Sequence, residues 1–399
     1  MTLVGSSVNE RLFTPDFVRL LVTNMAFQFG FASFFLLPKY MAQELHSGPA
    51  EIGWVTTAFG LAVLVAVPLV GRLLDELGTR RVLLAGSVLA VIAALGYLAV
   101  DRVGPLLLSL RCVQGLALSM FINAGSLVAA NHAPTGRLAQ AMGVFAASGM
   151  VMTAAAPAVA ELLAERWGYA PAFLAASASA LLALLLARGL PAAHDRGAQR
   201  GSLVSMLRRA TSQRMIVVLA ATGLGFGAMF TFSLPYALEL GLVSVRGFFL
   251  AFTASSLLVR LGFGGLIDRT GHRRSATYAV FGYAATVGAM YLLTPDRLSL
   301  FGALFGLAHG LFIPAFTAFV VNEVASYERG KLLTLFNGAF NLGNSLAFGL
   351  GMAAERFGYR NVFAITGVIV LAAPIALLGW PERASSADSE PAEGGLQRQ

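Results

Sequence analysis

The segment GRLLDELGTRR at residues 71–81 returns as GGLIDRTGHRR at residues 264–274, an offset of 193 residues. Two further pairs keep the same order along the chain. ERWGYAPAF (165–173) matches ERFGYRNVF (355–363), and VQGLAL (113–118) is echoed by AHGLFI (308–313). Because three echoes share nearly one spacing, the sequence predicts a duplicated structural unit.

Long apolar windows surround the repeated segments. Hydrophobic residues make up 57% of the 399 residues and charged residues only 12%, whereas soluble domains contain about 25% charged residues. A helix that crosses a bilayer needs about 20 mainly apolar residues, and only helices or closed barrels satisfy their backbone groups in lipid. The candidate windows are 20–38, 52–71, 82–100, 103–136, 138–160, 167–187, 215–238, 247–267, 275–295, 298–322, 332–354 and 361–381. We therefore expect an all-α integral membrane protein with twelve transmembrane helices in two pseudo-symmetric six-helix bundles.

The longest polar stretch between windows separates the two copies. The predicted organisation is an N-terminal bundle over 1–190, a cytoplasmic linker over 191–213, a C-terminal bundle over 214–381 and a tail over 382–399. The tail is rich in Ser, Glu and Gly, and this composition is typical of disorder. Equivalent positions of the two copies fall on the same side of the membrane, so the repeat is parallel.

Lysine and arginine gather on one side of the predicted membrane. With the N-terminus inside, 19 of the 28 lie at inner ends, seven at outer ends, and Arg111 and Arg260 within windows. The positive-inside rule then places both termini in the cytoplasm of a multi-pass protein of the cell (inner or plasma) membrane. Membrane lipids are the expected partners of these charges. The net charge of +8 is explained in this way, and we expect no nucleic-acid partner.

The repeated loop segment resembles a signature of the major facilitator superfamily. The matching residues are Gly71, Leu73, Asp75, Gly78, Arg80 and Arg81 in the first copy, and Gly264, Leu266, Asp268, Arg269, Gly271, Arg273 and Arg274 in the second. Within 103–136, LRCVQG resembles the family's R-x-x-Q-G signature through Arg111, Gln114 and Gly115. Glu76, where the family has a basic residue, and Ala156-Pro157, in place of Gly-Pro, depart from the pattern.

The resemblance covers residues 16–381 and implies a function. It is closest to bacterial drug or metabolite efflux members, and it implies a secondary transporter that moves a small organic solute by rocker-switch alternating access. Export is favoured over uptake, and the alternative is an uptake symporter or facilitator for a small metabolite. Coupling to protons as antiport is one form that the resemblance suggests, and we expect a monomer.

The resemblance also implies a cytoplasmic gate. Asp75 would face the start of the eleventh span and Asp268 the start of the fifth, where the positive end of a helix attracts a carboxylate. Gly71, Gly78, Gly264 and Gly271 would permit tight turns. The remaining gate residues, Arg80, Arg81, Arg273 and Arg274, would support the latch. The alternative is that the arginines are ordinary positive-inside charges.

Polar but uncharged residues suggest a cavity between the halves. Asn24 and Gln28 are i, i+4 neighbours, and Asn337, Asn341 and Asn344 form one helical stripe. Arg111, Gln114 and Tyr236 complete the predicted substrate cavity. Hydrogen bonds between helices are the alternative explanation of the asparagine stripe.

Acidic residues are placed only in loops, tails or window ends, so no carboxylate is predicted at the membrane midplane. An ionised residue within a span is costly and usually faces the protein interior, and the resemblance to proton-coupled exporters implies that Arg111 shapes proton movement or the substrate pocket. His309, which can titrate near neutral pH, is the second candidate for proton coupling. The alternatives are snorkelling to the outer interface or a structural hydrogen bond for Arg111, and a structural hydrogen bond for His309.

Other classes of function have weaker support. A membrane hydrolase would need Ser and His at depth, and Ser345 with His309 is the only passable pair, without a G-x-S-x-G motif. A transport-derived sensor is a further alternative. The single cysteine, Cys112, excludes an intramolecular disulfide and a multi-cysteine metal site. We expect no enzyme activity, no cofactor and no metal.

Overall fold

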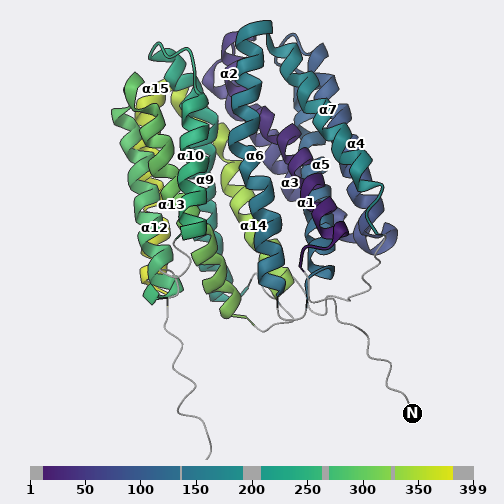
Figure 1. Ribbon diagram of the computed structural model, residues 1–399. Coiled ribbons are helices and arrows are strands. Elements are labelled where there is room, and N and C mark those ends of the chain that lie inside the picture. The colour runs from purple at the N-terminus through teal and green to yellow at the C-terminus, as the bar shows by residue number, and fades with distance from the viewer. Residues whose placement is uncertain (1–11, 135–136, 192–207, 263–268, 325–328, 381–399) are drawn as a thin grey trace, which may run out of the picture.

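Membrane-length helices make up the protein. The computed structural model describes residues 12–134, 137–191, 208–262, 269–324 and 329–380 (Figure 1). In the first half the helices are α1 (Pro15–Ala32), α2 (Leu37–Gln43), α3 (Pro49–Leu77), α4 (Thr79–Gly96), α5 (Pro105–Asn131), α6 (Leu138–Trp167) and α7 (Tyr169–Ala187). In the second half they are α9 (Ala210–Glu239), α10 (Arg246–Gly262), α12 (His272–Ala289), α13 (Leu298–Asn322), α14 (Arg329–Asn344), α15 (Ala347–Val370) and α16 (Ala372–Leu378).

These helices confirm the predicted all-α fold. Each window of the sequence analysis lies mostly on described helix, with 135–136, 263–267 and 381 outside the described residues. Nine helical stretches among the described residues are long and apolar enough to cross a membrane. The first span is divided into α1 and α2 by a 3-10 turn at Ser33–Leu36. The eleventh is divided between α14 and the start of α15. Most of the predicted linker (192–207), and the whole of the tail, lie outside the described residues, so their assignment stays a prediction.

Local sequence signals explain where several helices begin. Pro15, Pro49 and Pro105 each stand at the first helical position, where the missing N–H costs nothing and the fixed φ favours the helix. The Thr14 hydroxyl also accepts a hydrogen bond from the Phe17 backbone N–H at 3.3 Å. These starts follow from local chemistry alone.

The duplication is visible in the backbone. Gly78 has a φ of 79° between α3 and α4, and its repeat equivalent Gly271 has a φ of 83° before α12. Gly168, at 81° between α6 and α7, is matched by Gly358, at 77°, within α15. Side-chain-bearing residues rarely adopt this left-handed region, so both copies keep glycine at the same two corners.

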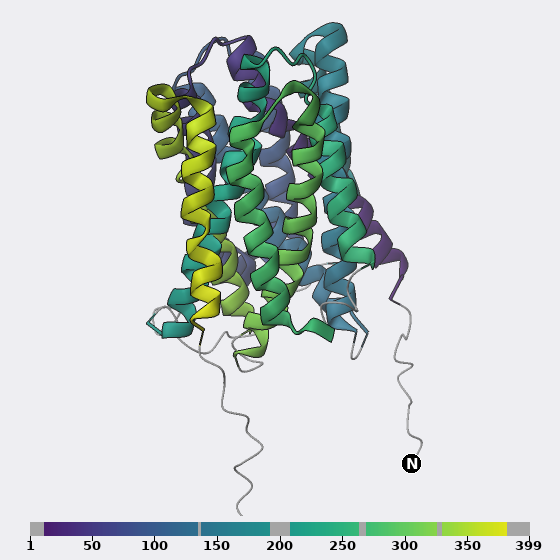
Figure 2. The same cartoon turned by 90° about the vertical axis from the view of Figure 1, so that its left-hand side faces the viewer.

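The two halves lie side by side. Figure 1 shows α1 to α7 on the right and most of the second-half helices on the left. The start of α1 and the end of α16 lie at the same end of the bundle, the lower end in Figure 2. We call this the inner end and the opposite one, where α2 meets α3, the outer end. The halves pack together chiefly through α3 against α15 and α6 against α10.

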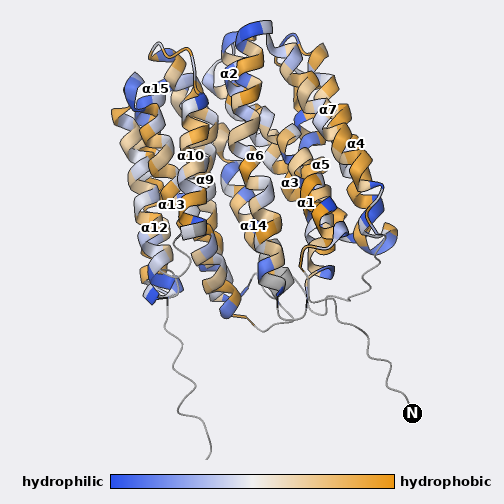
Figure 3. Ribbon diagram, in the orientation of Figure 1, coloured by the Kyte–Doolittle hydropathy of each residue, from blue (hydrophilic) through white to orange (hydrophobic). Residues whose placement is uncertain are grey.

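Apolar side chains cover the outside of the bundle. Large hydrophobic residues such as Val65, Val368 and Ile375 are more than half exposed. Figure 3 shows hydrophobic residues along the middle of the helices and hydrophilic residues gathered at the ends. A soluble surface of this kind would aggregate, whereas lipid tails cover it without cost. The protein is therefore a multi-pass membrane protein.

Candidate functional site

A cavity of about 50 Å³ lies where the two halves meet. Six phenylalanines make up most of its wall, and the polar groups are one arginine, two threonines and one asparagine. The lining residues are Phe31, Phe34, Phe35, Pro38, Thr56, Phe59 and Arg111 from the first half, and Phe226, Phe230, Thr231 and Asn344 from the second. We call it the central cavity. Mainly apolar walls with a few placed polar groups are typical of small-molecule sites.

Arg111 is the only charged residue that lines the central cavity. It lies on α5 and is 9% exposed. Its Nη1 donates a hydrogen bond to Gln114 Oε1 at 3.0 Å, its Nε donates to the Val55 carbonyl at 3.5 Å, and its guanidinium lies 4.7 Å from the Phe59 ring centre. The Tyr97 hydroxyl donates to the same Gln114 oxygen at 2.9 Å. These contacts hold the guanidinium in place at the cavity wall.

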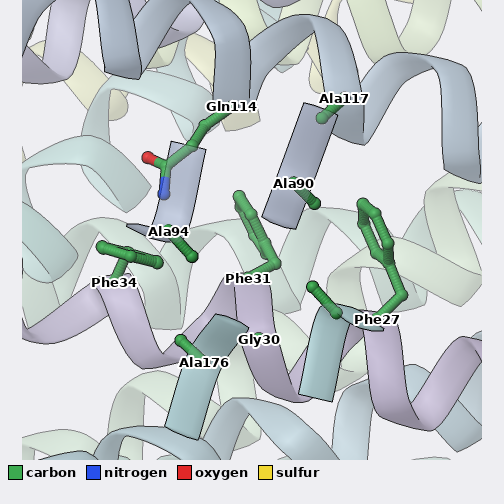
Figure 4. A pocket seen from close by; sticks show the side chains of 10 residues that line it. Phe27, Gly30, Phe31, Phe34, Ala90, Ala94, Gln114, Ala117 and Ala176 are labelled. Atoms are coloured by element: carbon green, nitrogen blue, oxygen red, sulfur yellow. The ribbon is translucent and has the colours of Figure 1, made fainter. Parts of the chain in front are cut away.

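Gln114 does not line the central cavity but a smaller cavity of about 20 Å³ inside the first half. Figure 4 shows its side chain above Ala94 and Phe34, with Phe27 and Phe31 along the same wall. Apart from this amide, the lining is apolar. Gln114 is thus held between the central cavity and the interior of the first bundle.

Three predicted cavity residues pack within one half. The Asn24 Nδ2 donates to the Phe145 carbonyl and to Ser148 Oγ, both at 2.9 Å, which joins α1 to α6. Gln28 lies against Gly149 of α6. Tyr236 packs against Tyr359 and Phe363, with ring centres 6.0 and 5.9 Å away. None of the three lines the central cavity, and Asn24 Oδ1 and Gln28 Oε1 are buried without a hydrogen-bond partner among the described residues. Their role in a substrate cavity stays a prediction.

The three asparagines of the α14 stripe lie in different surroundings. Asn344 lines the central cavity, while Asn341 donates from Nδ2 to the Asn337 carbonyl at 2.9 Å and Asn337 is exposed. The stripe therefore runs from the central cavity toward the inner end of α14.

His309 on α13 is enclosed by aromatic rings. It is 9% exposed, and its Nδ1 has no hydrogen-bond partner among the described residues. The nearest ring centres, at 5.2 to 6.3 Å, belong to Phe226, Phe252, Tyr283, Phe305 and Phe340. Phe226 separates it from the central cavity, whose lining it does not join. A role of His309 or Arg111 in proton coupling stays a prediction.

A buried ion pair of the first half binds a loop of the second half at the outer end. Lys39 of α2 and Glu161 of α6 are 2.5 Å apart, with side chains 4% and 1% exposed. Lys39 Nζ also donates to the Val243 carbonyl at 2.7 Å, and Glu161 Oε1 accepts the Val245 N–H at 2.7 Å. Val243 and Val245 belong to the second half, between α9 and α10. We call Lys39, Glu161 and this loop the outer latch.

The outer latch is not among the features that the sequence predicts. The only signal was that Lys39 and Glu161 each stand one residue beyond an apolar window. Nothing in the sequence indicates that these two window ends meet, because the residues are separated by more than a hundred positions.

Threonines extend the contact between the halves toward the middle of the membrane. Thr57 Oγ1 donates to the Ser345 carbonyl at 2.6 Å and accepts the Phe348 N–H at 3.0 Å, across the break between α14 and α15. The Thr153 and Thr253 hydroxyls, on α6 and α10, are 3.0 Å apart. These bonds satisfy polar groups that lipid could not, and they close the outer side of the central cavity.

Arginines at the inner end bind within their own half. Arg19 donates to the Gly189 carbonyl at 2.7 Å, and Arg80 donates to the Arg188 carbonyl, both at the end of α7. In the second half, Arg214 donates to the Gly379 carbonyl at 2.7 Å, and Arg273 donates to the Leu377 and Leu378 carbonyls at 3.1 and 2.8 Å. A cation at the carbonyl end of a helix stabilises it. The repeat therefore preserves a helix-capping device.

The remaining predicted gate residues make no described contact between halves. Gly71, Asp75, Arg81 and Arg274 are exposed at the inner end, and Gly78 and Gly271 are the left-handed corners described above. Gly264 and Asp268 lie outside the described residues. The cytoplasmic gate therefore stays a prediction.

Comparisons with known proteins agree with this architecture. A family model described as the Major Facilitator Superfamily matches residues 20–302 and 297–398. The chain is 25% identical over 357 residues to the multidrug resistance protein MdtG of Salmonella choleraesuis, with 84% of this chain and 87% of that protein covered. The MdtG protein of Citrobacter koseri is equally similar over 358 residues.

Solved structures show the same fold. The nucleoside transporter NupG matches with a TM-score of 0.73 at 15% identity, covering 92% of this chain and 98% of that one. A POT family transporter in complex with a thioalcohol-conjugated peptide matches with a TM-score of 0.76 at 12% identity, covering 91% and 95%. With the family model matching nearly the whole chain and two six-helix halves around a central cavity, this protein belongs to the Major Facilitator Superfamily.

Proposed function

We propose that this protein is a secondary transporter of the inner membrane that exports a small amphipathic organic solute by alternating access. The observation that carries the proposal is the central cavity, which lies between the two halves beneath the outer latch. A site shared by two rocking halves can face either side of the membrane without a continuous pore.

The contacts between halves are distributed unevenly along the membrane normal. The hydrogen bonds described between the halves run from the outer latch to Met150 and Ser256 near mid-membrane. The described hydrogen bonds of the inner arginines Arg19, Arg80, Arg214 and Arg273 go to carbonyls of their own half. This distribution supports assigning the structure to the state that is closed toward the outside.

Export is favoured by two observations. The relatives in the first comparison carry the name multidrug resistance protein, and the largely aromatic cavity wall suits an amphipathic solute rather than a sugar-like one. Uptake by a symporter or facilitator is the second candidate, since the solved structures of the same fold include a nucleoside transporter. The positive-inside bias supports cytoplasmic termini, and a monomer contains a complete cavity.

A reversible crosslink across the halves tests alternating access. In a Cys112→Ser background, Thr153→Cys and Thr253→Cys replace hydroxyls that are 3.0 Å apart, which is close enough for a disulfide. Proteoliposomes would be tested for counterflow of radiolabelled 2-naphthoate, 2-naphthamide and 2-naphthylmethylamine. We expect saturable counterflow that the oxidised pair abolishes and a reductant restores.

The Thr153→Cys single variant is the matched control, because it cannot crosslink and should continue to transport under oxidant. Counterflow that continues at full rate in the oxidised double variant would contradict alternating access. If none of the three naphthalene compounds shows saturable counterflow, the proposal that the protein transports solutes of this kind is contradicted.

A further inference from the structure

We infer that the central cavity selects an amphipathic organic monoanion, whose oxyanion head pairs with Arg111 and whose apolar body packs on the surrounding phenylalanines. This inference names the substrate class and rests on the proposed transport function. It starts from charge balance inside the membrane.

Arg111 carries a buried positive charge without a counter-charge. No carboxylate pairs with it among the described residues, and its printed hydrogen bonds go to the neutral Gln114 side chain and the Val55 carbonyl. Glu161 is already bound to Lys39, Ser244 and Val245. A buried charge is costly unless it is paired. A bound anion would supply the missing partner.

The geometry of Arg111 suits a planar oxyanion. Nε and Nη1 are committed to the protein, and the guanidinium lies over the Phe59 ring at 4.7 Å. Nη2 is in no described hydrogen bond, and the side chain lines the central cavity. Guanidinium groups bind carboxylates and other oxyanions through charge-assisted hydrogen bonds. The fixed orientation lowers the entropy cost of forming such a bond.

The rest of the cavity fits the apolar part of the same molecule. Phe226 and Phe230 stack with ring centres 4.2 Å apart, and Phe35 meets Phe230 edge-on at 5.1 Å. Asn344, Thr56 and Thr231 provide only neutral polar groups. An organic cation would meet Arg111 with no carboxylate on the wall to offset the repulsion. An anion with one charge and an aromatic or aliphatic body matches both parts of the site.

The inner surface favours the same sign of charge. The cytoplasmic ends of the spans carry most of the 28 lysines and arginines, including Arg19, Arg80 and Arg273, whose guanidinium groups lie at helix ends. A cation-rich entrance raises the local concentration of anions. Solutes that reach the cavity from the inner side are thereby selected for negative charge.

The test is equilibrium binding of a charge series to the purified full-length protein. 2-Naphthoate, 2-naphthamide and 2-naphthylmethylamine share one ring system and differ in charge. We expect 2-naphthoate to bind at least tenfold more tightly than the amide, and the amine not to bind. Arg111→Gln should remove at least tenfold of the naphthoate affinity and leave the amide affinity within twofold, while Arg111→Lys should retain part of the preference.

A second variant keeps the test valid if Arg111→Gln does not fold. Asn344→Asp is nearly isosteric and adds a carboxylate to the same cavity wall, so it should abolish the preference for naphthoate and allow the amine to bind. Arg297→Gln is the matched control, because it removes the same charge from an exposed outer loop and should bind as the wild type does.

The outcomes separate the substrate class from the transport function. Equal binding of the three probes, or naphthoate affinity unchanged in both Arg111→Gln and Asn344→Asp, would overturn the anion assignment even if counterflow occurs. Selective naphthoate binding without counterflow would leave the anion site standing and reject transport.

Discussion

The outer and inner ends of this transporter family member are held in different ways. At the outer end, Lys39 and Glu161 form a buried ion pair that also binds the loop of the other half. At the inner end, Arg80 and Arg273 sit at equivalent repeat positions and bind carbonyls at the end of the last helix of their own half. The outer contacts can hold the halves together, whereas the inner contacts hold each half rigid.

This difference indicates what must change during a transport cycle. Bonds within a half can persist while the halves rock, because both partners move together. The bonds of Lys39 and Glu161 to the loop before α10 join different halves, so they must break whenever the outside opens. The residues that make these bonds at the outer end are therefore the first to mutate.

Breaking the outer latch should have the largest effect. Glu161→Gln leaves Lys39 buried without a counter-charge, and removal of one partner of a buried pair costs about 3–5 kcal/mol. We expect a shift toward the outward-open state. Spin labels on Arg102→Cys and Asp296→Cys, both exposed outer sites on different halves, would show a longer distance in the Cys112→Ser background.

Glu165→Gln is the matched control for this variant. Glu165 lies one turn further along α6, and its pair with Arg246 at 3.4 Å has side chains 28% and 45% exposed. Exposed pairs contribute about 0–1 kcal/mol, so its distance distribution should resemble that of the wild type. Identical distributions in Glu161→Gln and Glu165→Gln would show that the buried pair does not close the outer end.

Removing a helix-capping arginine should lower stability without moving the halves. Arg273→Gln loses two bonds to the end of α16. Bonds from charged donors contribute about 1.5–3 kcal/mol when buried, and partial exposure reduces this to about 1–2 kcal/mol. We expect a melting temperature a few degrees lower in detergent, with unchanged outer distances.

Arg274→Gln is the matched control for the lower melting temperature expected of Arg273→Gln. It removes the same charge from the adjacent exposed position and should leave the melting temperature near that of the wild type. If Arg273→Gln melts normally but changes the outer distances, the division between rigid halves and a mobile outer contact is wrong.

The smallest effect is expected at Asp75 of the predicted cytoplasmic gate. Asp75 is exposed in this state, so Asp75→Asn should destabilise only the opposite, inner-closed state. A carboxylate at a helix start contributes about 0.3–1 kcal/mol. Labels on Arg72→Cys and Arg274→Cys, both exposed inner sites, should show a modest gain of the inward-open distance.

Glu76→Gln, an exposed neighbour of Asp75, should leave these inner distances unchanged. A shift of equal size in both variants would mean that general inner charge, and not the Asp75 position, controls the equilibrium.

The helices and their duplication could be predicted from the sequence, because both are specified by residues that are close together along the chain. Apolar windows located the helices, and the 71–81 and 264–274 repeats predicted the two halves. The R-x-x-Q-G signature led to Arg111, which lines the central cavity. By contrast, Asn24 and Tyr236 looked equally suitable as cavity residues, yet they pack within one half. Helical periodicity tells which face of a helix a residue occupies, but it does not tell which neighbouring helix or cavity that face contacts.

Length and hydropathy alone specify a duplicated helical membrane protein, since they fix the spans and lipid allows little else. The contacts that join the halves at the outer end could be identified only from the folded arrangement of the helices. Lys39 and Glu161 acquire their role from the approach of α2 to α6 and of both to the loop before α10. That approach depends on the packing of whole helices, and no local pattern in the sequence encodes it.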